Sequence, residues 1–419
     1  MRVLWFANTS VGCPGEPSSV GGGWMNALAS AFRRRSGIDL GVAFFGTGPR
    51  DFVEDGSIAY YPLVKSRTPL SRLFRFFRLT AQDASDLAAC RRVIERFRPD
   101  VIHVFGTERC FGLLCGRSEI PVVIHLQGLM GPTLNAWVPP GYAMRDCVFA
   151  SGISPIRAAL SLRAIAFNRH AAEREREILS NCRFVMGRTA WDSAFASLYA
   201  PRARYFHCDE ALRPFFLEAA SRTVPARAVF VSTLSGPLYK GHDVLLKTAK
   251  VLCETGHGDF EWRVFGVDQI RFAERKTGIR ADSVHVRTLG KVPPERLRDE
   301  LLVCTAYVHP SYVDNSPNSV CEAQVLGVPV VATNVGGVAS IVEEGRTGFL
   351  VPANDPVAMA TRMLDVVSGR ATLPPGWTDA VRERHDPDRV AARVLDIYQS
   401  VRALSLAGGN GTESAGGRG

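Results

Sequence analysis

The stretch that decides the fold is HPSYVDNSPNSVCEAQVLGVPVVATNVGG, residues 309–337. It begins at the end of a strand candidate, AYVHP, passes through a polar loop into a helix pattern, SVCEAQVLG, and ends in an apolar strand, VPVVA. Strand, helix and strand at this spacing predict a parallel βαβ unit. Ligands of such sheets bind outside the carboxyl ends of the strands, which is where the polar loop lies.

The polar loop and the following helix combine two carboxylates with free backbone amides. Asp314 lies in the loop, and Glu322 lies about one turn inside the helix, on the side that can face the same cleft. The first helical turn leaves N–H groups that favour a phosphate, and Ser316 and Ser319 are candidates for its cap. The pattern predicts a nucleotide-sugar site, with Glu322 accepting from ribose hydroxyls and Asp314 from the sugar. The alternative is a surface loop with a solvated Glu322.

The alternation of strands and helices continues in both directions from this unit. The second half restarts it at AVFVSTL, and the first half opens with RVLWFA, a glycine triplet at 21–23 and a helix pattern. We therefore expect an α/β protein with two parallel-sheet domains, residues 1–215 and 216–387, facing a cleft. A helix at 388–407 is expected to cross back to the first domain, and the Gly/Ser-rich residues 408–419 to form a flexible tail.

Composition narrows the class of protein. The chain has 419 residues, of which 46% are apolar and 22% charged, as in ordinary globular proteins. No apolar run is long enough to span a bilayer. The ten cysteines are scattered without a Cys-x-x-Cys pair, which favours reduced thiols in the cytoplasm. The net charge of +9 lies in residues 1–215, with 27 Lys and Arg against 18 Asp and Glu, so this half is expected to face an anionic partner.

The 309–337 stretch resembles the donor site of family 4 glycosyltransferases, retaining enzymes of the GT-B fold in which two Rossmann-like domains face a central cleft. That family has two glutamates, separated by seven residues, before a Gly-x-Pro-Val-Val-Ala strand and a Gly-Gly pair. Asp314 stands at the first glutamate position and Glu322 at the second. The continuation EEGRTGFLVPANDP also matches the family. The resemblance covers nearly all of residues 1–404 and is strongest over 305–356.

The resemblance implies roles for residues outside this stretch. Lys240 and Gly241 fit a Lys-Gly pair that grips the donor diphosphate, whereas the family's nearby arginine is replaced by Ser232 or Thr233. Another basic residue, Arg188 or Lys291, would then supply the charge. The expected donor-binding residues are Gly22, Gly23, Lys240, Gly241, Gly290, Lys291, Asn315, Ser316, Pro317, Asn318, Ser319 and Glu322.

The acceptor and the transferred sugar are expected on the first domain. Gln127 and Gly128 stand where the family commonly has His-Gly beside the sugar. His125 and Arg188 are further candidates on this side. The pattern favours a core histidine at His125 over a site role, and Arg188 can instead brace the domain junction.

Together these features predict a retaining hexosyltransferase with Asp314, Glu322 and Lys240 as catalytic residues. It would move a sugar from a nucleotide-diphosphate donor to a glycan or polyprenyl-diphosphate-linked acceptor in bacterial surface-polysaccharide synthesis. No cofactor and no metal are expected, since the Asp-x-Asp triplet at 386–388 precedes a helix and predicts a capping turn. No nucleic-acid signature is present. The alternatives are a non-catalytic nucleotide-sugar-binding partner subunit, favoured by the missing arginine and the Glu-to-Asp change, and a GT-B-fold nucleotide-sugar epimerase.

A basic stretch in the first half predicts a membrane contact. Residues 65–78 read KSRTPLSRLFRFFR. On a helix, Phe74 and Phe77 share an apolar stripe, and Arg72, Arg75 and Arg78 lie off it, which is typical of a helix on an anionic membrane surface. The expected location is therefore the cytoplasm, peripherally at the inner face of the plasma membrane. The alternative is a core-facing helix with solvated arginines.

Overall fold

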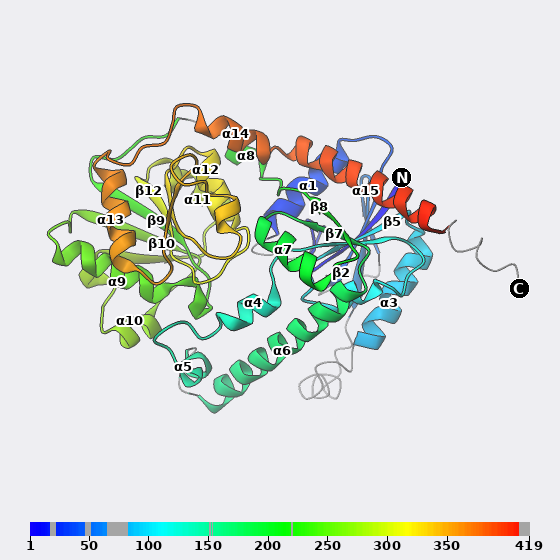
Figure 1. Ribbon diagram of the computed structural model, residues 1–419, viewed down its shortest axis with the longest axis horizontal. Helices are drawn as coiled ribbons and strands as arrows, with labels where there is room; N and C mark the ends of the chain where they lie inside the picture. Colours follow the sequence, from blue (N-terminus) through cyan, green and yellow to red (C-terminus); the bar gives the residue numbers. More distant parts are fainter. Residues whose placement is uncertain are drawn as a thin grey trace, which may run out of the picture.

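The computed structural model describes residues 1–16, 22–46, 52–64, 83–150, 152, 154–218 and 221–409. The chain forms two α/β units that lie side by side, each with its own sheet (Figure 1). The expected α/β class with two parallel-sheet domains is confirmed. The five residues of the predicted membrane contact, Arg72, Phe74, Arg75, Phe77 and Arg78, lie outside the described residues. None of the described helices is long and apolar enough to cross a membrane.

The first unit is built on a sheet that has eight strands within the described residues, in the order β3-β4-β2-β1-β5-β6-β7-β8. β3 and β4 pair antiparallel, and the other neighbours pair parallel. The central strand β1 is buried from Val3 to Ala7, as an apolar run must be in a parallel sheet covered on both faces. The strands are β1 (Arg2–Ala7), β2 (Asp39–Gly46), β3 (Val53–Asp55), β4 (Ile58–Val64), β5 (Val101–Phe105), β6 (Val122–His125), β7 (Phe184–Gly187) and β8 (Arg204–His207).

Helices cover both faces of this sheet. The longest of those described in this unit is α6, which begins at Pro155 after Ser154 and ends at Ser180, and proline is favoured in a first helical turn. The helices of the unit are α1 (Gly23–Arg33), α3 (Asp83–Phe97), the 3-10 helix η1 (Cys110–Leu114), α4 (Met130–Asn135), α5 (Met144–Phe149), α6 (Pro155–Ser180) and α7 (Ala190–Tyr199). The short helix α8 (Pro214–Leu217) follows them and packs into the core of the second unit through Phe216.

The second unit has a parallel sheet of six strands in the same described part of the chain, in the order β11-β10-β9-β12-β13-β14. All carboxyl ends therefore meet at one edge. The strands are β9 (Ala228–Thr233), β10 (Phe260–Phe265), β11 (Val286–Gly290), β12 (Ala306–His309), β13 (Val330–Thr333) and β14 (Phe349–Val351). The helices are η2 (Leu238–Lys240), α9 (His242–Glu254), α10 (Arg271–Thr277), η3 (Asp282–Val284), α11 (Pro294–Leu302), α12 (Asn318–Val325), η4 (Val338–Ser340), α13 (Pro356–Val367) and α14 (Trp377–Arg384).

The last helix, α15 (Pro387–Gly409), returns from the second unit to the first (Figure 1). It includes residues 408–409 of the expected tail, and residues 410–419 lie outside the described part. Val394 and Ile397 share a core cluster with Leu28 and Phe32 of α1. Asp386 and Asp388 cap and anchor the start of this helix: Asp386 Oδ1 accepts from the Arg389 N–H at 2.8 Å, and Asp388 pairs with Arg34 at 2.9 Å.

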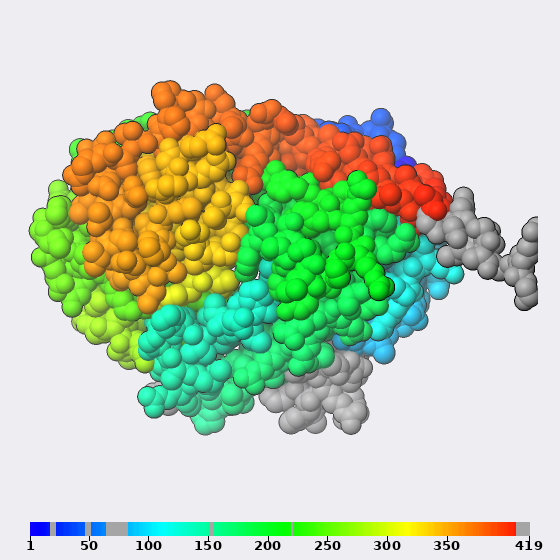
Figure 2. Space-filling model, viewed as in Figure 1, coloured from blue at the N-terminus to red at the C-terminus, as the bar shows by residue number. Residues whose placement is uncertain are grey.

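A second bridge between the units is formed by the segment from α4 to α5. Trp137 packs against Tyr239 with ring centroids 5.8 Å apart, and Tyr142 stacks on Phe272 of α10 at 6.3 Å. Asp146 pairs with Lys276 of α10 at 2.7 Å. Figure 2 shows this cyan-green segment lying against the second unit at the lower edge of the molecule. The two units are thus held together on opposite sides of the cleft.

Tyr398 of α15 anchors the returning helix through its hydroxyl. Trp5 Nε1 donates to Tyr398 Oη at 2.9 Å, and Tyr398 Oη lies 2.6 Å from His103 Nδ1. Because an indole N–H can only donate, the tyrosine proton goes to His103 Nδ1. Burial lowers the pKa of His103 to about 3, so the ring is neutral and accepts it.

We expect Tyr398→Phe to lower the free energy of unfolding by about 2 kcal/mol, because it leaves the buried Trp5 N–H and His103 Nδ1 without this partner. Denaturant titration measures the loss. Ser400→Ala on the same helix, where the hydroxyl bonds only the exposed Asp396 carbonyl, is the control and should change stability by less than about 0.5 kcal/mol. Equal effects of the two substitutions would contradict this account of the anchor.

Candidate functional site

A cavity of about 440 Å³ lies between the two units. Five of the predicted site residues line it: Gln127 and Gly128 from the first unit, and Lys240, Asp314 and Asn315 from the second. The remaining lining residues are Asn8, Glu108, Arg109, Leu129, Met130, Thr133, Trp137, Phe167, Asn168, Trp191, Tyr239 and Val313. Both polar and aromatic groups therefore surround this space, which suits a sugar.

Asp314 is the acidic centre of the cavity. Its Oδ2 lies 2.6 Å from Lys240 Nζ and 3.1 Å from His309 Nε2. Burial alone would raise the pKa of this carboxyl, but Lys240 and His309 together hold it well below the usual range. Sequence reasoning missed His309, the last residue of β12. Its position at the carboxyl end of a parallel strand was the available signal.

Lys240 reaches Asp314 because of the turn that follows it. Gly241 has φ +80°, and a Cβ at this position would lie 2.0 Å from the Pro310 carbonyl oxygen. Only glycine allows so close an approach in this conformation. Burial opposes the charge on Lys240, but Asp314 more than compensates and raises the pKa of the lysine. The site thus holds a fully ionised pair at neutral pH.

The Gly-Gly pair after β13 packs against the loop that carries Asp314. A Cβ at Gly336 (φ +52°) would lie 2.1 Å from the Asp314 carbonyl oxygen, and one at Gly337 would lie 2.4 Å from that of Asn315. The Gly337 N–H donates to the Asp314 carbonyl at 3.0 Å. The two glycines therefore fix the backbone on which the acidic residue stands.

Asn315 connects this loop to the first unit. Its Oδ1 accepts from Thr189 Oγ1 at 2.7 Å, and its Nδ2 donates to the Gln127 carbonyl and to Asp192 Oδ2, both at 3.3 Å. The side chain predicted to contact a donor is thus used to hold the two sides of the cavity together.

The helix α12 begins at Asn318, with Pro317 in the capping position and no side-chain cap. The expected caps Ser316 and Ser319 have other partners: Ser316 Oγ donates to Glu210 at 2.5 Å, and Ser319 Oγ accepts from Tyr307 Oη at 2.6 Å. The capping prediction was wrong because tertiary partners compete for these hydroxyls. The first N–H groups of a helix nevertheless favour an anion.

Glu322, one turn further into α12, pairs with Arg213 rather than lining the cavity. Arg213 Nη2 donates to Glu322 Oε1 at 2.5 Å. Burial raises the pKa of Glu322 to about 7, against the lowering effect of Arg213. A Cβ at Gly23 would lie 3.2 Å from Arg213 Nε, so the start of α1, with Gly22 before it, meets this pair from the first unit.

Comparison with known proteins bears on this arrangement. Residues 225–369 match the model of the family described as "Glycosyl transferases group 1". This part of the chain is therefore similar to group 1 glycosyltransferases. The predicted family 4-like glycosyltransferase resemblance is therefore confirmed.

Curated relatives match over part of their length. The GPI3 subunit of phosphatidylinositol N-acetylglucosaminyltransferase from Saccharomyces cerevisiae is 26% identical over 204 residues, which cover 47% of this chain and 45% of the yeast protein. A D-inositol 3-phosphate glycosyltransferase from Streptomyces scabiei is 40% identical over 119 residues, 28% of this chain and 26% of the relative. The matched stretches thus span half or less of these proteins.

Solved structures match over nearly the whole chain and show the GT-B fold. Sucrose-phosphate synthase from Thermosynechococcus elongatus has a TM-score of 0.70 at 16% identity, covering 96% of this chain and 99% of that one. Anabaena HepE in complex with UDP and glucose has a TM-score of 0.63 at 15% identity, covering 96% of this chain and 100% of that one.

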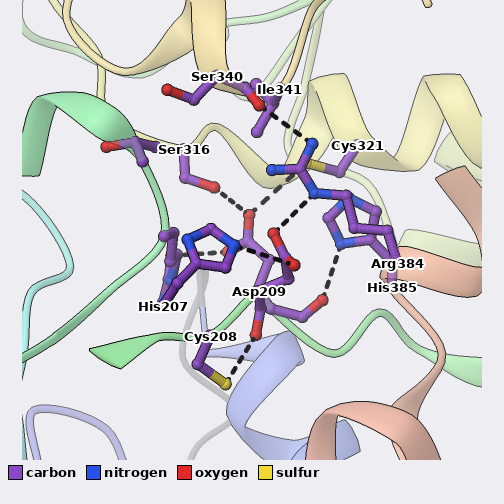
Figure 3. Close-up of polar contacts among 12 residues, drawn as sticks. His207, Cys208, Asp209, Ser316, Cys321, Ser340, Ile341, Arg384 and His385 are labelled. Atoms are coloured by element: carbon purple, nitrogen blue, oxygen red, sulfur yellow. Dashed lines mark hydrogen bonds and ion pairs between the residues drawn. The ribbon is translucent and has the colours of Figure 1, made fainter. Parts of the chain in front are cut away.

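The segment between the first unit and the second is clamped from several sides (Figure 3). Arg384 of α14 donates to Asp209 Oδ1 at 2.7 Å and to the Ser340 carbonyl at 3.1 Å, and His385 Nδ1 lies 2.9 Å from the Glu210 carbonyl. Burial would raise the pKa of Asp209, but His207 and Arg384 lower it to about 2. This clamp fixes the segment that carries both Glu210 and Arg213.

Several predicted residues lie outside the cavity. Arg188 is buried: its guanidinium donates to Glu210 at 2.7 Å and to Gln127 Oε1, and it lies 4.3 Å over the Trp24 ring. His125 is fully buried between Trp24 and His103, and neither ring nitrogen has a hydrogen-bond partner among the described residues. Burial holds the pKa of His125 well below its usual value. The structure thus puts His125 in the core.

Gly290 and Lys291 lie at the far edge of the second sheet. Gly290 is the last residue of β11, and Lys291 is exposed. In the strand order β11-β10-β9-β12, β11 lies three positions from β12, or about 14 Å at the usual strand spacing. Gly290 and Lys291 thus lie on the opposite side of the carboxyl edge from the strand that precedes Asp314.

We expect Gly337→Ala to destabilise the protein by about 1–3 kcal/mol, since the new methyl group would collide with the Asn315 backbone. Gly236→Ala is the matched control, because a Cβ there meets nothing within 4 Å. Thermal or denaturant unfolding compares the two. A cost at Gly337 no greater than that at Gly236 would show that the glycine pair does not constrain the loop.

The raised pKa of Glu322 predicts a dependence of stability on pH. The folded protein keeps a proton on Glu322 that the unfolded chain releases between about pH 4.5 and about pH 7. This contribution is complete below the unfolded pKa and is lost as pH rises through the folded one. Glu322→Gln, which cannot ionise, should therefore lose less free energy of unfolding than the wild type between about pH 5 and about pH 8.

Denaturant titrations at a series of pH values provide this measurement, with Glu343→Gln on the exposed surface as the control. Parallel pH profiles for the wild type and Glu322→Gln would contradict the burial of an ionisable group at this position.

Proposed function

We propose that the protein is a retaining glycosyltransferase that moves a hexose from a nucleotide-diphosphate donor to a glycan or polyprenyl-diphosphate-linked acceptor in bacterial surface-polysaccharide synthesis. The observation that carries the proposal is the Lys240–Asp314 pair in the cavity between the two units, opposite Gln127 and Gly128. A cation for the diphosphate and a carboxylate for sugar hydroxyls stand side by side where both substrates can meet.

In this proposal the donor extends along the carboxyl edge of the second sheet. The sugar enters the cavity beside Asp314, and the diphosphate lies between Lys240 and the N–H groups at the start of α12. Glu322 accepts from the ribose hydroxyls, and the base extends towards Gly290 and Lys291. The separation of about three strands between β11 and β12 supports this extended placement.

Arg213 is our candidate for the second positive charge, in place of the family's arginine. Ser232 and Thr233 are the residues at that position, and neither carries a charge; the buried Ser232 hydroxyl donates to the Val308 carbonyl at 2.6 Å. Arg188 forms a buried ion pair with Glu210, and Lys291 lies at the sheet edge. Arg213, by contrast, lies between Glu322 of the second unit and Gly23 of the first. On donor binding it would move to the diphosphate and free Glu322 for the ribose.

The reaction then needs no dedicated base from the chain. The bond between the anomeric carbon and the diphosphate oxygen breaks, the acceptor oxygen bonds to the same face, and the acceptor proton passes to the departing diphosphate. Lys240 stabilises the charge that develops on the leaving group, and the partly dry cavity strengthens that interaction. The proposal includes no metal and no cofactor.

A second candidate is a nucleotide-sugar-binding subunit without catalytic activity. The missing arginine and the shorter side chain of Asp314 favour it. An epimerase would use the same cleft but would convert the donor without an acceptor.

The cytoplasmic location and the membrane contact through residues 65–78 also stay predictions.

Thermal-shift screening with UDP-, GDP- and dTDP-sugars identifies the donor, and transfer to crude lipid-linked acceptors then tests the activity. We expect Lys240→Met to weaken donor binding at least about tenfold and Asp314→Asn to reduce transfer about a hundredfold or more. Lys247→Met, which removes a lysine paired with Asp243 on α9, should leave both unchanged.

The outcomes separate the candidates. Transfer with retained anomeric configuration, seen by NMR of the product, supports the proposal. Donor binding without turnover would contradict it in favour of the partner subunit, and epimerised donor without acceptor would favour the epimerase.

A further inference from the structure

A cluster of exposed apolar side chains marks α5 and the first turns of α6. Ile156 is 74% exposed, and the other members are also open to solvent: Met144, Phe149, Leu160 and Leu162. Five of the twelve large apolar side chains exposed among the described residues thus fall within residues 144–162. Figure 1 shows α5 and the start of α6 at the lower edge of the molecule, away from the sheets. So dense an apolar surface indicates a partner.

The orientation of α6 turns Ile156 and Leu160 away from the protein. Ile165 is buried. It lies nine residues beyond Ile156, which at about 100° per residue puts it on the opposite side of the helix. Leu160 follows Ile156 by four residues and shares its outward face. The first turns of α6 therefore expose an apolar face to solvent.

The chain segment that carries most of the cluster has a positive net charge. From Cys147 to Ala172 the sequence contains three arginines, Arg157, Arg163 and Arg169, and no Asp or Glu. The carboxylate just before this stretch, Asp146, is neutralised by Lys276 at 2.7 Å. Apolar side chains flanked by arginines fit the boundary of an anionic bilayer, where both kinds of group are favourable. A symmetric contact between two copies would instead bring the arginines together.

We propose that the surface formed by Met144, Phe149, Ile156, Leu160 and Leu162 docks on an anionic lipid bilayer. The same helix carries Phe167 and Asn168, which line the cavity. The eleven residues from Ile156 to Phe167 span about 17 Å at the helical rise. A lipid-linked acceptor held in the bilayer at the start of α6 would therefore present its sugar end at the cavity. The membrane docking does not depend on the proposed function, whereas the delivery of a lipid-linked acceptor to the cavity rests on it.

Vesicle sedimentation tests the docking without any sugar transfer. We expect the wild type to sediment with equimolar phosphatidylcholine–phosphatidylglycerol vesicles, less so in high salt, and weakly with phosphatidylcholine alone. The double variant Ile156→Asp/Leu160→Asp should bind the anionic vesicles at least about tenfold more weakly, because it puts charge into the apolar face. Leu198→Asp, at an exposed leucine of α7, is the matched control and should bind like the wild type.

Each other outcome overturns the proposal. If the wild type stays in the supernatant with anionic vesicles, this surface does not bind lipid. A double variant that still sediments, while Arg72→Glu/Arg75→Glu/Arg78→Glu does not, assigns the contact to residues 65–78 instead. If light scattering shows that the wild type is a dimer and the double variant a monomer, and neither binds vesicles, this face is an interface between two copies of the chain. Retained thermal shifts with the nucleotide sugar show that the variants are folded and keep the proposed donor site separate from this result.

Discussion

The ion pair between Lys240 and Asp314, 2.6 Å apart and largely shielded from water, is the constraint on which the site depends. Buried charges are stable only when they are paired and hydrogen-bonded, so the cavity must keep both partners together with His309. The same pairing keeps both groups ionised, as the proposed contacts with a diphosphate and a sugar hydroxyl require. Gly241 and the Gly336-Gly337 pair exist at these positions because bulkier residues would separate the two loops.

The relative position of the two units is fixed by other contacts than this ion pair. Asn315 bonds to the first unit, the segment with Asp209 and Glu210 is clamped by Arg384 and His385, and α15 anchors in the first core through Tyr398. The α4–α5 segment closes the other side through Lys276 and Tyr239. These contacts join the units at several points around the cavity. Opening for substrates must therefore break polar contacts that are individually modest.

Sequence reasoning predicted the fold well because apolar runs and helical spacing are local signals, as in RVLWFA and the 154–180 helix. It also brought Lys240, Asp314, Asn315, Gln127 and Gly128 to one cavity. It also allowed for a core position of His125, which the structure shows. It could not foresee that Arg213 pairs with Glu322 or that Glu210 takes the Ser316 hydroxyl. Those outcomes depend on contacts between residues far apart in the chain, which no local pattern encodes.

A calorimetric double-mutant cycle on Lys240 and Asp314 with a nucleoside diphosphate tests the central claim most directly. If the lysine is shared between Asp314 and the diphosphate, Asp314→Asn alone should strengthen diphosphate binding by releasing Lys240, Lys240→Met should weaken it, and the double variant should show no gain over Lys240→Met. Additive effects, or binding that ignores both substitutions, would contradict the account.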